Sequence, residues 1–377
     1  MGKRDNFMRY VAYGGKPICS PQIGGGAGFD TRLVGKEWIS ETTLEDTLGV
    51  VRQFDIVPLI NIGLCDLGEC NPSLKWEETI LQQNGRIERE YRLSTPQGML
   101  FKKSIEEKFS PPFSVKYSVQ TADDLRAFEY YLDGAKECDF SVVTEFTKDV
   151  SERIGQTGAL CVQWAVQPYE LLCFPNTVDT VMLAQDCPSL FRKLMDKIVI
   201  LDEKLFDAVA RGGADFIFLG APGVEMISPT YYDDYIIPYS QQVSAKAHYH
   251  GLKVYSHICS PIEPFLSMGF YNRMGIDLFE TLSPSPVGNI ISLKDAMNKI
   301  DPGICTRGNL GLDILLNGTT EAVKEETQNI MEATQGRKHM VAASDYLFFQ
   351  VPEENIRTMA EAVNSWRAHT GDSNALD

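Results

Sequence analysis

The chain has 377 residues, of which 44% are hydrophobic and 23% charged, and its formal net charge is −16. These proportions are typical of a globular enzyme and exclude a disordered or collagen-like chain. An acidic chain is repelled by phosphate backbones and anionic lipid surfaces, so neither nucleic acid nor a membrane is an expected partner. The length predicts two domains, or one large barrel with an additional lobe.

The first residues contain no apolar signal core, and no later stretch approaches 18 apolar residues. We therefore expect a cytoplasmic protein. Nine cysteines are scattered along the chain without close CxxC pairs. This pattern is a poor disulfide framework and favours a reducing compartment, in which most of the thiols are expected to be buried.

Short runs rich in β-branched residues alternate with longer helical patterns along most of the chain. The runs expected to be strands are 56–62, 140–146, 159–166, 215–220, 253–259, 276–282, 303–309 and 339–346. Amphipathic helices fit between them, for example over 188–211, 231–250, 319–334 and 352–369. Eight strands that alternate with helices predict an α/β fold of the (β/α)8 or TIM-barrel type.

Two regions fall outside this repeat. Residues 1–55 are expected to form an N-terminal extension, and 56–377 the barrel. The interval 63–139 is too long for one crossover, and Thr95-Pro-Gln-Gly98 separates two strand-like runs that predict an inserted β-hairpin lobe. The Gly24–Gly28 cluster lacks the strand and helix that flank a phosphate loop, so we expect a flexible loop.

Residues with metal-binding chemistry lie where two predicted strands end. Active sites of (β/α)8 enzymes lie at the C-terminal ends of the strands. The fifth strand ends with His257-Ile-Cys259, and residues two apart in a strand point to the same face. An imidazole and a thiolate together suit zinc. Glu280, at the end of the sixth strand, is a further candidate.

The eighth predicted strand ends at Asp345, and alternation places this residue on one face with Val341 and Ala343. Two other candidates are less well placed. Cys305 sits low in the seventh strand, where a buried structural thiol is favoured. Asp277 opens the sixth strand, at the wrong end for the barrel mouth, and is favoured as a capping or loop residue.

Further polar and aromatic residues cluster around the predicted barrel mouth. Glu225 lies on the loop after the fourth strand, as either a proton shuttle, a partner of a ligand or a surface acid. Helical spacing directs most of the tyrosines that follow to the core, but Tyr231 or Tyr232 could line a pocket. The candidates beside Asp345 and in the seventh strand are Tyr346, Phe348, Phe349 and Asn309. An aromatic wall beside a metal suits a planar organic substrate.

Several short motifs together resemble the uroporphyrinogen decarboxylase-like superfamily. The similarity covers roughly residues 140–370. The motifs are Gly213-Ala-Asp, Ile227-Ser-Pro, Ser256-His-Ile-Cys259, Gly308-Asn-Leu310, Asn317-Gly-Thr-Thr-Glu-Ala-Val323 and Pro352-Glu-Glu-Asn-Ile356.

Two branches of that superfamily differ in residues that this sequence allows us to compare. The decarboxylases carry an N-terminal Arg-Gln-Ala-Gly-Arg stretch and an aspartate at the end of the first strand, whereas this N-terminus reads Asn6-Phe-Met-Arg-Tyr10 and the first predicted strand ends Leu59-Ile-Asn-Ile62. The corrinoid-dependent methyltransferases carry His-x-Cys and a later Cys, and this chain has His257-x-Cys259 with Asp345 at the third position. The resemblance therefore implies zinc on His257, Cys259 and Asp345, with Glu280 or Cys305 as less favoured ligands.

That branch implies a methyltransferase that moves a methyl group from a small methylated compound to the Co(I) corrinoid (cobalamin) of a separate carrier protein. The harder Asp ligand favours an ether oxygen, so an aromatic methyl ether is one expected donor. Glu225, Glu280 or Tyr231 would protonate the product. Substrate contacts are expected from Tyr232, Tyr346, Phe348 and Asn309.

Three alternatives remain open at this point. One is a zinc methyltransferase that passes a methyl group from the corrinoid to tetrahydrofolate or a thiol. Another is a metal-free decarboxylase of a less charged substrate than a porphyrinogen. The third is a degenerate barrel used as a binding subunit. The assembly state is also open, with a homodimer as one option.

Overall fold

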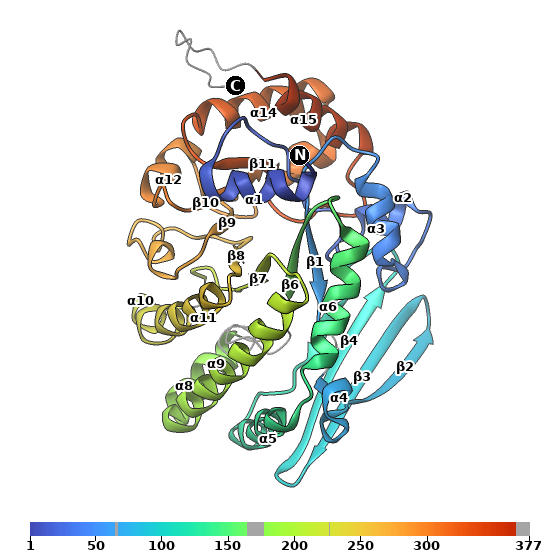
Figure 1. Cartoon of the computed structure of the whole chain (residues 1–377), viewed down its shortest axis with the longest axis vertical. Helices are drawn as coiled ribbons and strands as arrows, with labels where there is room; N and C mark the ends of the chain where they lie inside the picture. Colours follow the sequence, from blue (N-terminus) through green and yellow to red (C-terminus); the bar gives the residue numbers. More distant parts are fainter. Residues whose placement is uncertain (65–66, 164–176, 226, 367–377) are drawn as a thin grey trace.

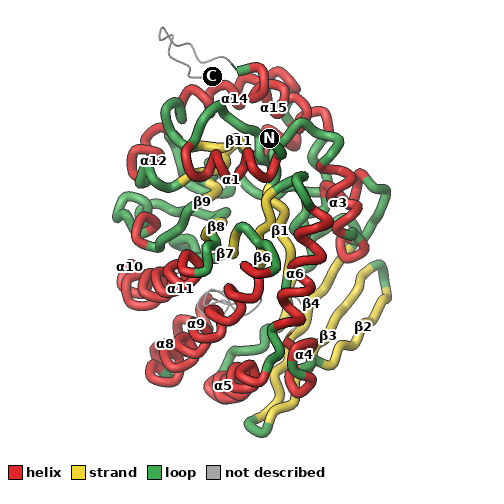
Figure 2. The backbone as a smooth tube through the Cα atoms, in the orientation of Figure 1, coloured by secondary structure: helices red, strands yellow, loops and turns green. Residues whose placement is uncertain are grey.

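The framework of the molecule is a curved sheet of seven parallel strands with helices packed around it (Figures 1 and 2). The computed structural model describes residues 1–64, 67–163, 177–225 and 227–366. In spatial order the strands are β1 (Leu59–Gly63), β6 (Ala159–Gln163), β7 (Phe216–Phe218), β8 (Lys253–His257), β9 (Leu278–Thr281), β10 (Cys305–Leu310) and β11 (His339–Ala343). Spatial order equals chain order, as expected when strands and helices alternate.

Helices connect successive strands and cover the convex side of the sheet (Figure 1). They are α6 (Ser141–Ile154), α8 (Thr177–Asp186), α9 (Pro188–Arg211), α10 (Pro229–Tyr231), a π-helical turn (Tyr232–Ile236), α11 (Ile237–Tyr249), α12 (Leu293–Lys299), α13 (Leu312–Asn317), α14 (Thr320–Ala333) and α15 (Glu353–Ser365). In α9 the buried residues Leu194, Ile198, Leu201 and Leu205 recur at helical spacing and face the sheet side.

Seven of the eight predicted strands are confirmed, and one is wrong. The run 140–146 belongs to α6 instead of a strand. The buried residues of this helix are Val143, Thr147, Val150 and Ile154, a spacing of three to four residues that forms one helical stripe. The β-branched pair at the start of the run therefore belongs to an amphipathic helix, because tertiary packing overrides local strand preference.

The N-terminal segment lies between the two edges of the parallel sheet. The amide of Val341 in β11 donates to Ile18 O at 3.0 Å, and the amide of Ser20 donates to Val341 O at 2.8 Å. On its other side, Cys19 O accepts from the amide of Val57, just before β1, at 2.8 Å. A segment expected to be an extension thus joins the sheet edges and helps to curl the sheet into a barrel-like shape.

A second, antiparallel sheet lies beside β1 and α6 (Figure 1). Its strands are β2 (Glu77–Gln83), β3 (Arg86–Thr95), β4 (Gly98–Glu107) and β5 (Phe113–Lys116). β3 and β4 pair antiparallel, and the turn between them lies between Thr95 and Gly98, where the sequence predicted the turn of a hairpin.

Shorter helices complete the N-terminal part and the connections. They are α1 (Lys3–Tyr13), α2 (Phe29–Leu33), α3 (Leu44–Val51), α4 (Leu67–Cys70), α5 (Ala122–Gly134) and the 3-10 turns Ile39–Glu41, Pro72–Leu74, Ala135–Glu137 and Tyr271–Arg273. Thr43 and Thr121 form capping boxes with the residues three positions later, which begins α3 and α5 at these points.

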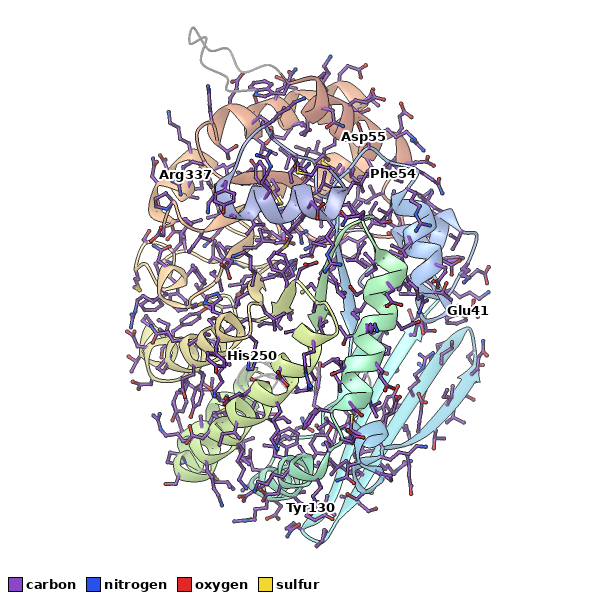
Figure 3. The ribbon with its side chains drawn as sticks, in the orientation of Figure 1. Glu41, Phe54, Asp55, Tyr130, His250 and Arg337 are labelled. Atoms are coloured by element: carbon purple, nitrogen blue, oxygen red, sulfur yellow. The ribbon has the colours of Figure 1, made fainter. Side chains whose placement is uncertain are left out.

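Two apolar clusters stabilise the fold, and side chains fill the space between its layers (Figure 3). The larger cluster lies mainly between the sheet and the helices. The smaller one fills the concave side near the start of the strands, where Phe7 of α1 packs edge-on against Phe216 at 5.8 Å between ring centroids. Among the described residues no helix is both long and apolar enough to cross a membrane.

Candidate metal centre

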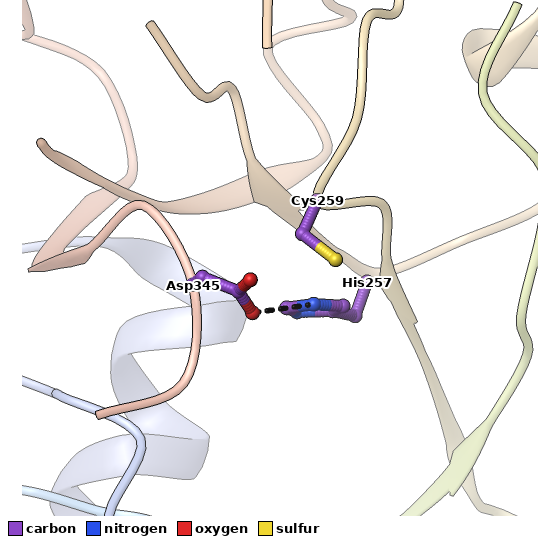
Figure 4. Close-up of side chains that lie close together, drawn as sticks. All are labelled: His257, Cys259 and Asp345. Atoms are coloured by element: carbon purple, nitrogen blue, oxygen red, sulfur yellow. Dashed lines mark ion pairs between the residues drawn. The ribbon is translucent and has the colours of Figure 1, made fainter. Parts of the chain in front are cut away.

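Three side chains with metal-binding atoms converge at the C-terminal ends of β8 and β11 (Figure 4). His257 is the last residue of β8, Cys259 follows two residues later, and Asp345 lies two residues after β11. One ligand atom from each lies within 4.8 Å of the others. His257 Nε2 is 3.3 Å from Asp345 Oδ1.

The chemistry of these donors fits a zinc ion. Zinc accepts imidazole nitrogen, thiolate sulfur and carboxylate oxygen, and catalytic zinc sites commonly use three protein donors. The sequence prediction named His257, Cys259 and Asp345, and the fold brings these three together. The strand-parity argument for Asp345 was wrong, however. Val341 and Ala343 belong to the outer apolar cluster, so the turn after β11 directs Asp345 toward His257.

A buried network holds the other nitrogen of the histidine ring. His257 Nδ1 lies 2.8 Å from Glu280 Oε1, and Arg307 Nε donates to Glu280 Oε2. Arg307 also donates to Tyr255 Oη at 3.1 Å, and Gln22 Nε2 donates to the same oxygen at 2.6 Å. Because Glu280 binds Nδ1, the other nitrogen, Nε2, points toward Asp345. In many metal sites a carboxylate on the far ring nitrogen orients the histidine in this way.

The electrostatics of the site favour a charged histidine when no metal is bound. Burial alone would lower the pKa of His257, but its contacts with Asp345, Cys259 and Glu280 raise that pKa well above the usual value. A metal ion needs the neutral ring, so ion binding would release a proton from this site. Burial and the neighbouring Glu280 also raise the pKa of Tyr255, which keeps its hydroxyl protonated.

Tyr346 covers one side of the histidine. Its ring centroid lies 5.0 Å from that of His257. Asn61 Nδ2 and Gln163 Nε2 lie 3.3 and 3.4 Å from the Tyr346 hydroxyl oxygen, and both donate to it. Tyr346, predicted as a substrate contact, therefore lies directly at the metal-binding group, between side chains from β1 and β6.

The other predicted substrate contacts and the loop acid lie further from the histidine ring or on the rim. Asn309 is buried in β10 and donates to Leu282 O at 3.0 Å. Phe348 packs against the main apolar cluster. Glu225 is exposed on the loop after β7. A Cβ added at Gly223 would lie 2.0 Å from Ser260 Oγ and 2.6 Å from Glu225 Oε2, so this loop approaches the residue that follows Cys259.

The two tyrosines at the start of the α10–α11 segment belong to the apolar core. Tyr231 stacks on Tyr235 with 4.8 Å between ring centroids. Tyr232 packs against Phe265 and Phe270 and donates from its hydroxyl to Pro222 O at 3.3 Å. The structure does not bring either ring into the group formed by His257 and its neighbours, so their catalytic and substrate-binding roles remain predictions.

Cys305 and Asp277 are distant from the metal-binding group. Cys305 lies in the lower apolar cluster, and burial raises the pKa of its thiol to about 12. Asp277 accepts from the amide of Val254 at 2.8 Å and pairs with His248 and Lys253 before β9 begins. Both residues therefore have the structural surroundings that the sequence favoured for them.

Sequence reasoning named Glu280, which binds the histidine ring, but it missed the other residues that support the ring and Tyr346. Gln22 lies in the segment expected to be an extension, and no sequence signal connected it to β8. Arg307 and Asn61 had a usable signal, because each alternates with inward-facing residues of its own strand. The residues 164–166 of the predicted third strand lie outside the described residues.

The fold and this group of side chains define a parallel α/β, barrel-like protein with a candidate metal centre at the C-terminal ends of its strands. The family model described as uroporphyrinogen decarboxylase (URO-D) matches residues 98–366. The chain therefore belongs to the uroporphyrinogen decarboxylase family.

Individual relatives are distant. A uroporphyrinogen decarboxylase of Gluconobacter oxydans (strain 621H) is 22% identical over 238 residues, which cover 60% of this chain and 62% of that protein. One of Prochlorococcus marinus (strain MIT 9301) is 25% identical over 227 residues, 58% of this chain and 62% of the relative. The chain thus spans less than two thirds of the length of these relatives.

A solved structure resembles the chain over almost its whole length. A methyltransferase from Methanosarcina mazei aligns with a TM-score of 0.66 and 15% identity, and the alignment covers 97% of this chain and 98% of that one. At this identity the likeness shows a shared fold. The N-terminal segment, which the family match does not reach, belongs to that shared architecture.

Proposed function

We propose that the protein is a zinc-dependent methyltransferase that moves a methyl group from a small methylated compound, with an aromatic methyl ether as one candidate, to the corrinoid of a separate carrier protein. The observation that carries the proposal is the convergence of His257, Cys259 and Asp345 at the ends of two strands. The fold shared with a methyltransferase supports it. Bound zinc would supply a Lewis acid for the heteroatom that carries the methyl group.

The residues of the chain have distinct tasks in this proposal. His257, Cys259 and Asp345 hold the ion, and Glu280 accepts from His257 Nδ1 and so fixes the orientation of the ring. The ring of Tyr346 limits the space beside the histidine. Orientation of the methyl donor in this confined position lowers the entropic cost of transfer. Glu225, exposed on the rim, is the candidate that exchanges protons with solvent.

The experiment combines metal analysis with methyl transfer. Protein is purified from zinc-supplemented cells without chelator, and zinc is measured for the parent and for His257→Ala, Cys259→Ala and Asp345→Ala. We expect about one zinc per chain in the parent and loss in all three variants. Each protein is then incubated with free cob(I)alamin and methoxybenzene or methanol, and methylcobalamin is followed by absorbance.

Matched controls test whether loss of zinc is specific. His248→Ala removes a histidine that pairs with Asp277, and Cys138→Ala removes a thiol beside Leu67 O. Both controls should retain the metal of the parent. A parent without zinc would overturn the metal-dependent mechanism, and zinc that survives Asp345→Ala would exclude Asp345 as a ligand.

A decarboxylase is the second candidate, because the curated relatives are named uroporphyrinogen decarboxylases. One observation on this chain favours it. Arg307 Nη1 is buried in the barrel-like interior and has no hydrogen-bond partner among the described residues. A guanidinium N–H of this kind suits a substrate carboxylate. Release of carbon dioxide from uroporphyrinogen, or from a less charged carboxylate substrate, by zinc-free protein would support this candidate and contradict the methyltransferase.

A further inference from the structure

Residues 23–28 form a glycine-rich loop beside the candidate metal centre. The loop connects residues 18–20, which join the sheet edges, to α2. The amide of Leu347 donates to Gln22 O at 3.2 Å, and the amide of Phe29 donates to Leu347 O at 3.3 Å. Both ends of the loop, residues 23–28, are therefore attached to one residue next to Tyr346. The sequence analysis excluded a phosphate loop here, predicted a flexible loop and gave no role to these glycines.

The base of this loop also reaches the histidine. Gln22 Nε2 lies 3.3 Å from His257 Nδ1 and donates to Tyr255 Oη at 2.6 Å. Gln22 is 2% exposed, so its side chain is committed to the interior of the site. The loop therefore contacts the surroundings of the candidate metal centre at two points. At the base of the loop Gln22 lies beside His257, and in the middle of the loop Gly25 lies against Tyr346.

The glycines of the loop differ in what they contact. A Cβ added at Gly25 would lie 2.5 Å from Cε1 and 3.1 Å from Cδ1 of Tyr346. Added at Gly26 it would meet nothing within 4 Å. Both residues have positive φ, +71° and +93°, so an alanine at either position carries a similar backbone strain. Only Gly25 adds a contact with the ring that covers His257.

We propose that Gly25 is a positioning residue for Tyr346: the missing side chain lets the Tyr346 ring lie between the loop and His257, and the ring, placed in this way, forms a wall that limits the size of the methyl donor. The size limit rests on the proposed function, whereas the placement of the ring does not. The hydroxyl of Tyr346 is held by Asn61 and Gln163, so displacement of the ring would disturb both contacts.

The first test compares Gly25→Ala with Gly26→Ala in the metal-free protein. Crystal structures of both variants should show the Tyr346 ring displaced from His257 in Gly25→Ala and unmoved in Gly26→Ala. Thermal unfolding is then measured for the two single variants and for each of them combined with Tyr346→Ala. The comparison gives the coupling in stability between each glycine position and Tyr346. We expect the extra destabilisation by Gly25→Ala to disappear when Tyr346 is alanine. If Gly25→Ala alone does not fold, recovery in the double variant serves as the same test.

The second test measures methylation of cob(I)alamin by zinc-loaded protein with methanol and with methoxybenzene. Gly25→Ala should lower kcat/KM by about 10- to 100-fold, the scale of a misplacement near 1 Å, and by different factors for the two donors. Gly26→Ala should leave the ratio between the donors unchanged. A ring that stays in place in Gly25→Ala, or equal effects of the two alanines, would overturn the positioning role. A parent that transfers no methyl group would instead contradict the proposed function, and the crystal structures would still decide the role of Gly25.

Discussion

The lower and upper halves of the concave side of the sheet carry opposite kinds of side chain. Near the start of the strands the interior is apolar, and α1 closes it from below. The apolar cluster at this level includes Phe7, Leu59, Phe216, Leu278, Cys305 and Met340. Two residues further along the same strands the interior becomes polar. The side chains there include Asn61, His257, Glu280 and Arg307, joined by Gln22, Tyr346 and the hydroxyl of Tyr255, whose ring belongs to the lower cluster.

The difference shows how one set of strands serves both stability and chemistry. Inward positions alternate along each strand, so Cys305 and Arg307 occupy successive levels of the same interior. The lower level excludes water and packs tightly. The upper level contains the buried ion pair of Glu280 and Arg307. Removing these charges from water is unfavourable in free energy, and such unfavourable burial is typical of functional sites.

The largest expected effect comes from breaking the ion pair of the upper level. Arg307→Met removes the guanidinium that pairs with the buried Glu280 carboxylate and leaves His257 as its remaining partner, and we expect a loss of up to about 3–5 kcal/mol in the free energy of unfolding. Denaturant titration measures it. Adding Glu280→Gln should recover part of the loss. Arg126→Met, which breaks an exposed pair with Asp123, should cost about 1 kcal/mol or less. An equal cost for both arginines would contradict the comparison.

A cavity in the lower level should affect stability without affecting the metal. Met340 is fully buried, and Met340→Ala should lower the free energy of unfolding by about 2–5 kcal/mol. The folded variant should bind as much zinc as the parent, because Met340 belongs to the apolar cluster and supplies no atom to the candidate metal centre. Denaturant titration and metal analysis on the same sample provide the check. Loss of zinc from folded Met340→Ala would show that the two levels are coupled.

The histidine at the start of β11 should make stability depend on pH. Burial lowers the pKa of His339 to about 4, while its ring contacts Gly308 O and Thr306 Oγ1. Because the folded-state pKa lies below the unfolded value, the unfolded chain binds a proton first as the pH falls. The contribution of His339 is fully present above about pH 6.5 and declines by about 3 kcal/mol toward pH 4. Between about pH 6.5 and pH 4 the free energy of unfolding of the parent should fall by about 3 kcal/mol more than that of His339→Asn. Denaturant titrations of the metal-free proteins measure both values. A constant difference between the two proteins would contradict it.

The smallest effect concerns the orientation of the metal-binding ring. Glu280→Gln removes the charge that accepts from His257 Nδ1, and we expect zinc affinity to fall by about 10- to 100-fold. Competition with a chelator measures the change. Asp277→Asn is the matched control, because it weakens a carboxylate contact with His248 before β9 begins. Unchanged affinity in Glu280→Gln would show that the charge of Glu280 does not contribute to metal binding by the ring.

Much of the fold was predictable because strands and helices leave different periodicities. Strands β1 and β6–β11 and helix α9 were found at nearly their observed positions. The failure at 140–146 arose because Val142 and Val143 resemble a strand locally, whereas only packing against neighbouring elements shows the helical stripe. The role of residues 18–20 was also missed, since the partners of this segment lie at Val57 and Val341, far away in the sequence.

The sequence by itself determined the alternation of strands and helices, because periodicity is a local property, and its resemblance to the corrinoid-dependent methyltransferases named the three candidate ligands. Only the tertiary structure decided how Asp345 reaches His257, which residues support the ring, and which side chain lies against Gly25. These features depend on contacts between segments more than 200 residues apart, such as Gln22 with Tyr255 and Gly25 with Tyr346. Such contacts have no periodicity, and they exist only once the curved sheet brings its two edges together.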